Sequence, residues 1–285
     1  MKSRREFLAA GAAMAAGLLA ARASVRAAGQ PAKFKIGATD WNLRLEGDPA
    51  CVALAKELGF DGVQISLSNK NGKDWIGDAV LDQFVAESKR LKLPIASVCL
   101  NILHKNYLKS DPKGPQRVAD AIPMAKRVGV DVILLPFFGP GALKTVEEMD
   151  YVGDILKEIG PQAQKAGVIL GLEDTISARN NVRIMERSQS TAVLTYYDVG
   201  NSTLGGFNVI DEIRWLGVER ICEVHLKDNP HYLGEGTIDF PGVVKALTDI
   251  GYSRWAQLET DTPKGVKEDM AKNLAYIRKL TSAPA

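Results

Sequence analysis

The sequence is poor in the residues from which thiol and zinc sites are built. Its 285 residues include three cysteines, Cys51, Cys99 and Cys222, and three histidines. The cysteines form no CxxC pair and no zinc-finger spacing, and Cys99 and Cys222 lie in apolar, strand-like stretches. We therefore expect these thiols to act as small buried hydrophobic residues. The absence of a thiolate cluster argues against a structural zinc site.

Neither sign of charge dominates, and no nucleotide-binding motif stands out. The chain has 36 Lys and Arg against 34 Asp and Glu, for a formal net charge of +2. Nucleic-acid binding usually needs a clustered basic surface, so we expect no nucleic-acid partner. Neither GxGxxG nor GxxxxGK[ST] follows an early strand-like stretch. The length is enough for one large domain with a substantial core.

Residues 1–30 have the composition of an export signal. Arg4 and Arg5 are followed by Phe7 and Leu8 and then by a mildly apolar stretch of Ala, Gly and Leu. This stretch is short and weakly hydrophobic for a membrane span, and small residues offer cleavage positions near residues 23 and 27. The block SRREFL resembles the twin-arginine signal, which implies export of the folded protein to the bacterial periplasm without stable membrane association. A cytoplasmic amphipathic extension is the alternative.

Residues 31–285 alternate between strand-like and helix-like stretches. Because β-branched apolar runs separated by helices favour a parallel sheet buried on both faces, eight such units predict an α/β fold, a (β/α)8 TIM barrel in one domain. A doubly wound open sheet is the competing architecture. The expected strands are 34–39, 62–67, 95–100, 131–138, 168–173, 192–198, 221–226 and 255–259. The expected helices are 48–59, 79–91, 116–128, 145–166, 182–188, 208–216, 241–250 and 266–280.

The last four predicted strands each end in a side chain that can bind a metal. Glu173, Asp198, His225 and Glu259 follow apolar runs directly, and the carboxyl ends of barrel strands share one face. A single carboxylate at a strand end is more often a helix cap or an ion pair. Three carboxylates and an imidazole together predict a site for one divalent ion, such as Mn²⁺, Mg²⁺, Co²⁺ or Zn²⁺.

The residues around this quartet resemble a known family, the xylose isomerase-like TIM-barrel sugar isomerase/epimerase superfamily. The matching stretches are LGLED at Glu173, YYDVGN at Asp198, VHLKDN at His225, LGEGTIDF up to Phe240 and QLET at Glu259. The resemblance covers nearly all of the chain after the signal. It implies a barrel that holds one divalent ion, often Mn²⁺, through these four side chains. It also implies that Glu173 and Glu259 are the acid/base catalysts, as in ketose epimerases.

The sequence departs from the ketose epimerases at several positions near the predicted substrate. Asn201 stands where a histidine usually follows the metal aspartate, and Gln64 stands where a glutamate is frequent. The arginine that follows the metal histidine is missing, and the nearest polar residues are Lys227 and His231. These four residues are candidates for substrate binding, although Lys227 could equally be a solvated turn lysine. The departures leave the identity of the substrate open.

Aromatic and imidazole side chains follow other predicted strands. Trp41, His104, Phe137 and Phe138 would stand at the same face as the quartet, where aromatic walls suit a sugar. Packing at the barrel rim is the alternative. Export to the periplasm would favour free sugars or glycosides over sugar phosphates as substrates. The sequence leaves a homo-oligomer possible.

The expected activity is therefore a metal-dependent isomerase or epimerase that abstracts a proton from a keto-sugar or sugar derivative. The reaction would pass through a metal-chelated enediolate. Two alternatives remain: a lyase or hydrolase of 3-keto-glycosides with the same site, and a non-catalytic sugar-binding barrel. An apurinic endonuclease is disfavoured, because its centre is rich in histidine and this chain has three histidines in all.

Overall fold

The computed structural model describes residues 34–69 and 75–282, and the predicted export signal in residues 1–30 lies outside them. Eight parallel strands follow one another around a closed barrel, in which β8 pairs with β1. This confirms the predicted (β/α)8 fold. The strands are β1 (Lys35–Thr39), β2 (Gly62–Ser66), β3 (Ile95–Cys99), β4 (Val132–Pro136), β5 (Ile169–Glu173), β6 (Val193–Asp198), β7 (Ile221–Leu226) and β8 (Trp255–Leu258).

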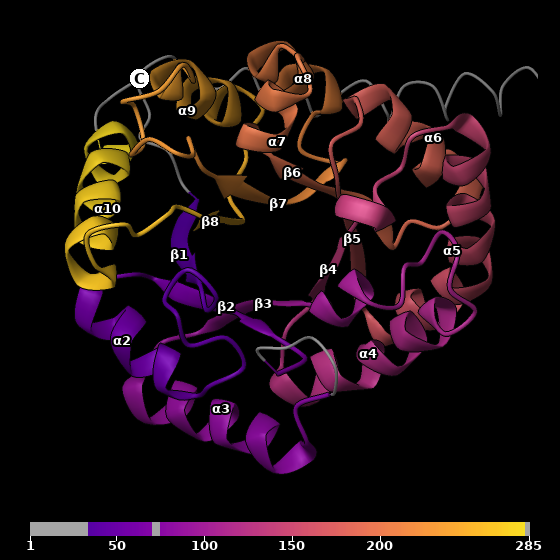
Figure 1. Ribbon diagram of the computed structural model, residues 1–285, viewed down its shortest axis with the longest axis horizontal. Helices are drawn as coiled ribbons and strands as arrows, with labels where there is room; N and C mark the ends of the chain where they lie inside the picture. The colour runs from indigo at the N-terminus through magenta and orange to yellow at the C-terminus, as the bar shows by residue number, and fades with distance from the viewer. Residues whose placement is uncertain (1–33, 70–74, 283–285) are drawn as a thin grey trace, which may run out of the picture.

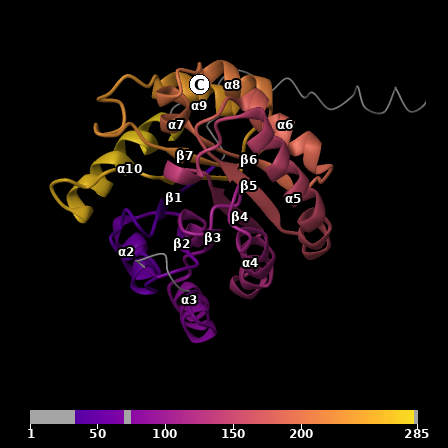
Figure 2. The same cartoon turned by 45° about the vertical axis from the view of Figure 1, so that its right-hand side comes forward.

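Helices form an outer ring around these strands (Figures 1 and 2). The helices are α2 (Ala50–Leu58), α3 (Asp78–Leu91), α4 (Gly114–Val128), α5 (Val146–Ala166), α6 (Ala178–Ser188), α7 (Val199–Leu204), α8 (Val209–Leu216), α9 (Phe240–Asp249) and α10 (Val266–Ser282). Two 3₁₀ turns, η1 (Asn101–His104) and η2 (Gly139–Gly141), follow β3 and β4. The eight predicted strands and eight predicted helices are present with shifted ends, whereas α7 and the two 3₁₀ turns were not predicted.

Local sequence explains where most helices begin and end. Gly59, Gly129 and Gly167 end α2, α4 and α5 in the left-handed conformation, with φ of 86°, 85° and 65°. The hydroxyl of Ser177 accepts a hydrogen bond from the backbone N–H of Asn180, so α6 begins four residues before the predicted start. These caps fix the lengths of the loops that carry the chain to each strand.

The strands alternate between an outer face packed on the helices and an inner face in the barrel. On β4, Ile133, Leu135 and the following Phe137 belong to the large core between strands and helices, whereas Val132 and Leu134 lie in a smaller cluster. That cluster also contains Cys99, Tyr196 and Cys222. All three cysteines are free and buried, as predicted. Because side chains two residues apart share a face, this alternation decides which residues reach the mouth of the barrel.

The interior of the barrel is more polar than its apolar strands suggest. The fully buried Glu223 accepts hydrogen bonds from Ser97 Oγ (2.8 Å), Tyr196 OH (2.8 Å) and Gln257 Nε2 (3.2 Å). Gly37 leaves the space that the side chain of Gln257 occupies. This network lies one inward position below His225 on β7 and links four strands beneath the site.

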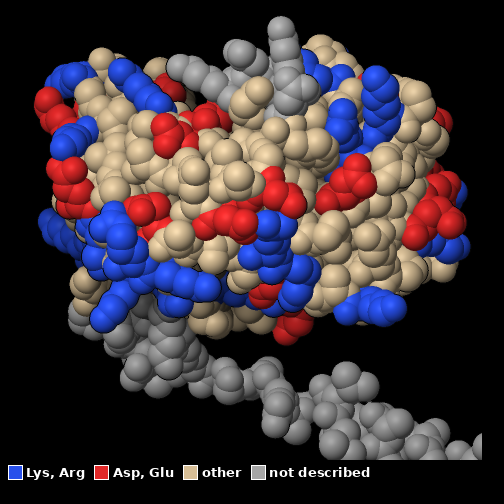
Figure 3. Space-filling view, turned by 90° about the horizontal axis from the view of Figure 1, so that it is seen from below, with Lys and Arg blue, Asp and Glu red and all other residues tan. Residues whose placement is uncertain are grey.

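Ion pairs between arginine and aspartate side chains join neighbouring helices on the outside of the barrel. Arg127 on α4 bonds Asp82 on α3 at 2.7 Å, and Arg187 on α6 bonds Asp154 on α5 at 2.6 Å. On the face seen in Figure 3, lysines and arginines lie close to aspartates and glutamates over much of the surface. None of the helices in the described part of the chain has the length and apolar character to cross a membrane.

Candidate metal centre

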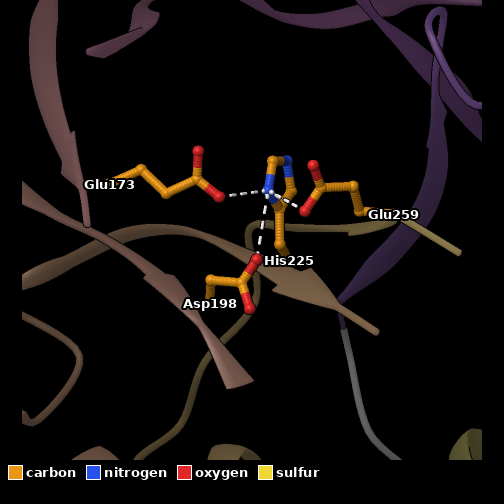
Figure 4. A group of neighbouring side chains, drawn as sticks. All are labelled: Glu173, Asp198, His225 and Glu259. Carbon is orange, nitrogen blue, oxygen red and sulfur yellow. Dashed lines mark hydrogen bonds and ion pairs between the residues drawn. The ribbon is translucent and has the colours of Figure 1, made fainter. Parts of the chain in front are cut away.

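The predicted quartet comes together at the carboxyl end of the barrel. Glu173 and Asp198 are the last residues of β5 and β6, His225 is the fifth residue of β7, and Glu259 directly follows β8. The register places Asp198 beside His225 on paired strands. Figure 4 shows the three carboxylates directed toward one nitrogen of the His225 ring, with Glu173 and Glu259 on opposite sides. Strand order and register therefore bring together residues up to 86 positions apart.

The ligand atoms of these four residues all lie within 4.8 Å of one another. His225 Nδ1 is 2.8 Å from Glu173 Oε1, 3.3 Å from Glu259 Oε2 and 3.7 Å from Asp198 Oδ2. Glu173, Asp198 and His225 are buried, and Glu259 is partly buried. Three carboxylates that are this close together in a largely buried site repel each other unless a positive charge lies among them.

The donor set fits one divalent cation. Carboxylates and an imidazole bind Mn²⁺, Mg²⁺, Co²⁺ and Zn²⁺, and the quartet is the group that could hold a metal within the described residues. Asp198 Oδ2 is buried and lies 2.9 Å from Lys227 Nζ, without a well-aligned hydrogen bond from any residue that the structure describes. A buried carboxylate oxygen needs polar partners, and coordination to a metal cation would add to the ion pair with Lys227. The four residues can thus hold one metal ion.

The surroundings shift the pKa values of the quartet in different directions. Burial raises the pKa of Glu173 to about 7, although the charge of His225 opposes the shift. Burial also favours the neutral form of Glu259, but the positive charges of Lys227 and His225 outweigh it and lower its pKa. Burial acts to lower the pKa of His225, and the carboxylates of Glu173 and Glu259 raise it above its ordinary value. The two glutamates therefore differ in basicity.

Lys227 supplies a positive charge at the edge of the quartet. Its Nζ lies 2.7 Å from Glu259 Oε2 and 2.9 Å from Asp198 Oδ2, and its side chain is 14% exposed. It follows Glu223 and His225 on the inward face, because residues two apart on a strand point the same way. Burial acts to lower the pKa of Lys227, but Asp198 and Glu259 raise it. Lys227 is therefore a bound cation of the site and not a solvated turn lysine.

Three further side chains hold His225 and Glu259 of the quartet in place. The fully buried Gln64 has its Oε1 2.8 Å from His225 Nε2, and Trp41 Nε1 donates to Glu259 Oε1 at 3.2 Å. The Tyr196 ring meets the imidazole edge-on at 4.6 Å between centroids. An Nε2–H that donates to Gln64 leaves Nδ1, the nitrogen facing the carboxylates, to bind a cation. Gln64 thus contacts a residue of the quartet, and it is not among the residues that line the cavity.

A cavity of about 470 Å³ opens above the quartet. We call it the central cavity. Of the predicted substrate-binding residues, Trp41, His104, Asn201 and Lys227 line it. Phe138 also lines it, whereas Phe137 is 1% exposed in the outer core. The expectation that both phenylalanines face the site was therefore wrong for Phe137, because alternation along the strand directs it outward.

His231 does not reach the central cavity. It is exposed and lines a separate pocket on the far side of Lys227. It lies in the loop after β7, where backbone Asp228 O accepts from His231 N at 2.9 Å and closes a turn. Sequence proximity to the metal histidine suggested a substrate contact in the same cavity, but this turn carries His231 away from it.

Glu46 and Asn101 are cavity residues that the predicted site did not include. Both line the central cavity, and Asn101 Nδ2 donates to Glu46 Oε1 at 2.6 Å. Glu46 lies in the loop after β1, which is held because the buried Asp40 accepts hydrogen bonds from Gly47 N (2.9 Å) and Ser66 N (2.7 Å). No periodic pattern marks a residue in such a loop. Asn101, by contrast, lies two residues after the end of β3 and begins η1, so it stands near a strand end like the members of the quartet.

The fold and the cluster together define a class of protein: TIM barrels with a Glu, Asp, His and Glu cluster that could hold a metal ion at the carboxyl ends of strands five to eight. The chain belongs to the Xylose isomerase-like TIM barrel family, which it matches over residues 52–280. Its relatives include sugar epimerases.

Three individual proteins illustrate this similarity. The putative L-ribulose-5-phosphate 3-epimerase SgbU of Escherichia coli (strain K12) is 27% identical over 247 residues, which span 76% of this chain and 84% of that protein. An L-ribulose 3-epimerase has a similar fold, with a TM-score of 0.72, 17% identity and coverage of 87% and 95% of the two chains. The 3-keto-D-glucoside 4-epimerase YcjR of E. coli also has a similar fold, with a TM-score of 0.70 and 18% identity. The match covers 87% of this chain and 100% of that chain.

Proposed function

We propose that this protein is a metal-dependent epimerase or isomerase that acts on an unphosphorylated keto-sugar or sugar derivative by proton abstraction. The observation that carries the proposal is the placement of Glu173 and Glu259. Both line the central cavity, and they lie on opposite sides of the His225 ring (Figure 4). Two carboxylates on opposite sides of a bound carbon can remove a proton from one face and return it to the other.

The residues would divide the reaction among them. A divalent cation held by the quartet would act as a Lewis acid on the substrate carbonyl oxygen and make the neighbouring C–H more acidic. One glutamate removes the proton to give an enediolate, and the other protonates the opposite face with inverted configuration. Lys227, held 2.7 Å from Glu259 Oε2, places a positive charge near the developing anion. The abstracting group is more basic when its pKa is higher, which favours Glu173.

Asn201 offers a hydrogen bond to the substrate. Its side chain is 6% exposed, lines the central cavity, and has an amide nitrogen without a hydrogen-bond partner among the described residues. A buried N–H that lacks an acceptor is costly, and a sugar hydroxyl or carbonyl oxygen would supply one. Asn201 follows the metal residue Asp198 by three positions, so it stands next to the reacting atoms.

The charges around the cavity favour a neutral substrate. Three carboxylates line it, those of Glu46, Glu173 and Glu259, and none of its described lining residues is an arginine. Its one lysine, Lys227, is already paired with two carboxylates. A phosphate group would meet net negative charge here. The E. coli relative named for a 5-phosphate substrate therefore suggests the reaction more than the substrate.

The test uses the two glutamates. In Glu173→Gln and Glu259→Gln an amide oxygen can still coordinate, but it cannot act as a base. Each variant should be slower by at least roughly 10²-fold at saturating Mn²⁺. The abstracting-base variant should lose exchange of substrate C–H with D₂O, and the other should retain exchange while forming no epimer. Near-normal turnover by both variants in excess metal would exclude the acid/base pair.

The same experiment separates the alternatives. A 3-keto-glycoside lyase would release an aglycone, and one glutamate alone would be needed for exchange. A non-catalytic sugar-binding barrel would show binding without exchange.

We further propose that residues 1–30 direct export to the periplasm through Arg4 and Arg5. Periplasmic delivery of a variant with both arginines changed to lysine would contradict this.

A further inference from the structure

A second pocket opens beside the central cavity, and we call it the side pocket. It measures about 170 Å³ and lies over the loop between β7 and α9 and the end of α7, with Thr203, Leu204, Pro230 and Ile238 in its wall. Lys227 lines both the side pocket and the central cavity. One ligand could therefore reach from one to the other across a single side chain.

The boundary between the two spaces is fixed. The Lys227 stem packs so closely on Gly200 that a Cβ at this glycine would collide with Lys227 Cγ. At the other end, Nζ is held by Glu259 and Asp198. The side chain cannot turn into the side pocket without losing both ion pairs. The side pocket is thus a space of its own and not room left for a mobile lysine.

The outer wall of the side pocket is also held in place. Asp228 Oδ2 accepts hydrogen bonds from Gly236 N at 2.9 Å and Gly234 N at 3.2 Å, which folds the loop back on its start. Leu233 N donates to Asn273 Oδ1 on α10 at 2.8 Å. The loop lies beside α10 in both ribbon views (Figures 1 and 2). A wall fixed in advance costs little entropy when a ligand binds.

The chemistry of the side pocket differs from that of the central cavity. Leu204, Pro230 and Ile238 give it apolar surface, alongside the polar Thr203, Asp228, Asn229 and Thr237. Leu204 is 81% exposed, more than any other large hydrophobic residue in the described chain that is recorded as exposed. The exposed His231 adds one imidazole at the rim. Apolar cavities of about 150 Å³ in proteins hold a benzene ring, so the side pocket has room for one six-membered ring.

We propose that the side pocket binds the aglycone of a keto-glycoside whose sugar ring occupies the central cavity. This inference rests on the proposed function and specifies its substrate class. The carboxylates, Asn201 and Lys227 suit the hydroxyls and carbonyl of the sugar, whereas the walls of the side pocket suit an apolar ring. Because Lys227 lines both spaces, an aglycone joined to the sugar through its glycosidic oxygen would pass along Lys227 to enter the side pocket.

The experiment compares two glycosides with the same sugar. Binding of methyl and phenyl 3-keto-β-glucoside to the Mn²⁺-loaded protein is measured by calorimetry, together with exchange of sugar C–H in D₂O. The phenyl glycoside should bind roughly tenfold more tightly, as expected when part of one ring leaves water. Thr237→Trp, at an exposed residue of the pocket wall, should fill the pocket and abolish this difference without changing the affinity for the methyl glycoside.

The controls separate this inference from the proposed function. Leu204→Ala should lose part of the phenyl advantage, and Tyr151→Ala, which removes an exposed ring on α5, should lose none of it. Equal binding of the two glycosides, or a phenyl advantage that survives Thr237→Trp, would overturn the side-pocket assignment while C–H exchange still upheld the proposed function. Absence of both exchange and glycoside binding would refute the two together.

Discussion

The two halves of the barrel contribute different kinds of residue to the same cavity. From the half containing β5 to β8 come Glu173, Asn201, Lys227 and Glu259, all at a strand end or within three residues of it. The half containing β1 to β4 supplies the strand ends Ser66, Cys99 and Pro136, together with residues from the loops and 3₁₀ turns that follow the strands: Trp41, Glu46, Asn101, His104 and Phe138. The first set holds the charges that the proposed chemistry needs, and the second forms the facing wall.

The difference has a physical reason. Four side chains that share one ion must be placed within a few tenths of an ångström, and paired strands give that precision through their register. A wall that recognises a substrate can tolerate more movement, and loops vary more readily than strands. The β5 to β8 half should therefore determine metal binding and turnover, and the β1 to β4 half should determine affinity for the substrate.

The largest effect is expected from a matched pair of histidines. His225→Ala should lose most of its bound metal, by well over roughly 100-fold in affinity, because a direct ligand matters more than the outer partners of a ligand. Its turnover should fall with the metal. His104→Ala removes an imidazole from the opposite wall of the cavity and should keep the metal. Elemental analysis and metal titration measure both.

Folding is checked separately, since His225 is fully buried. Circular dichroism should show that His225→Ala keeps the barrel fold. If the alanine variant does not fold, His225→Gln, with a larger side chain, replaces it in the experiment. Excess Mn²⁺ should raise the melting temperature of wild type and His104→Ala but not of His225→Ala. Full metal occupancy in the His225 variants would show that the quartet is not the metal site.

A smaller effect, on the stability of the metal-free protein and on turnover, is expected at Lys227. Lys227→Met leaves the carboxylates of Glu259 and Asp198 without their cation. Breaking a buried ion pair by removing one partner costs roughly 3–5 kcal/mol, so the metal-free variant should be less stable. Added Mn²⁺ should restore more stability than in wild type, because the metal would then neutralise more charge. Turnover should still fall by roughly tenfold or more.

Lys267→Met is the matched control for this variant. Lys267 pairs with Glu57 at the surface, where both side chains are more than half exposed, and such pairs contribute little. Denaturant unfolding with and without metal compares the two substitutions. If Lys227→Met were as stable without metal as wild type, Lys227 would not be a structural cation of the site.

The same contrast explains what the sequence could predict. The quartet was found because each member ends an apolar strand, and parallel strands end at one face. Lys227 follows by alternation from His225, although its ion pairs do not. Phe137 was misplaced where alternation from Val132 and Leu134 would have selected Phe138 alone. The period of two therefore holds more information than the strand ends by themselves.

Other features depend on contacts that no local pattern records. Glu46 enters the cavity because Asp40, six residues earlier in its loop region, bonds the backbone at Gly47 and Ser66. His231 leaves the cavity because of a turn at Asp228. Helix α7 was absent from the predicted elements because its six residues are too few for a periodic signal. Loops closed by long-range hydrogen bonds are thus the part that only the structure supplies.

The smallest effect is expected in the β1 to β4 half, at Glu46. Glu46→Gln keeps the size of the side chain and an oxygen that can accept from Asn101 Nδ2, but it removes one negative charge from the cavity wall. If this wall only recognises the substrate, KM for a neutral keto-sugar should change by several-fold at most, of the order of one hydrogen bond to a charged group, while kcat and metal content stay the same. Inhibition by an anionic substrate analogue should become stronger, since less negative charge opposes it. Glu57→Gln, at an exposed residue of α2, controls for the change in net charge. Steady-state kinetics with both variants would decide the matter: a fall in kcat in Glu46→Gln comparable to that in Glu173→Gln would mean that the β1 to β4 half takes part in the chemistry and that the division between the two halves is wrong.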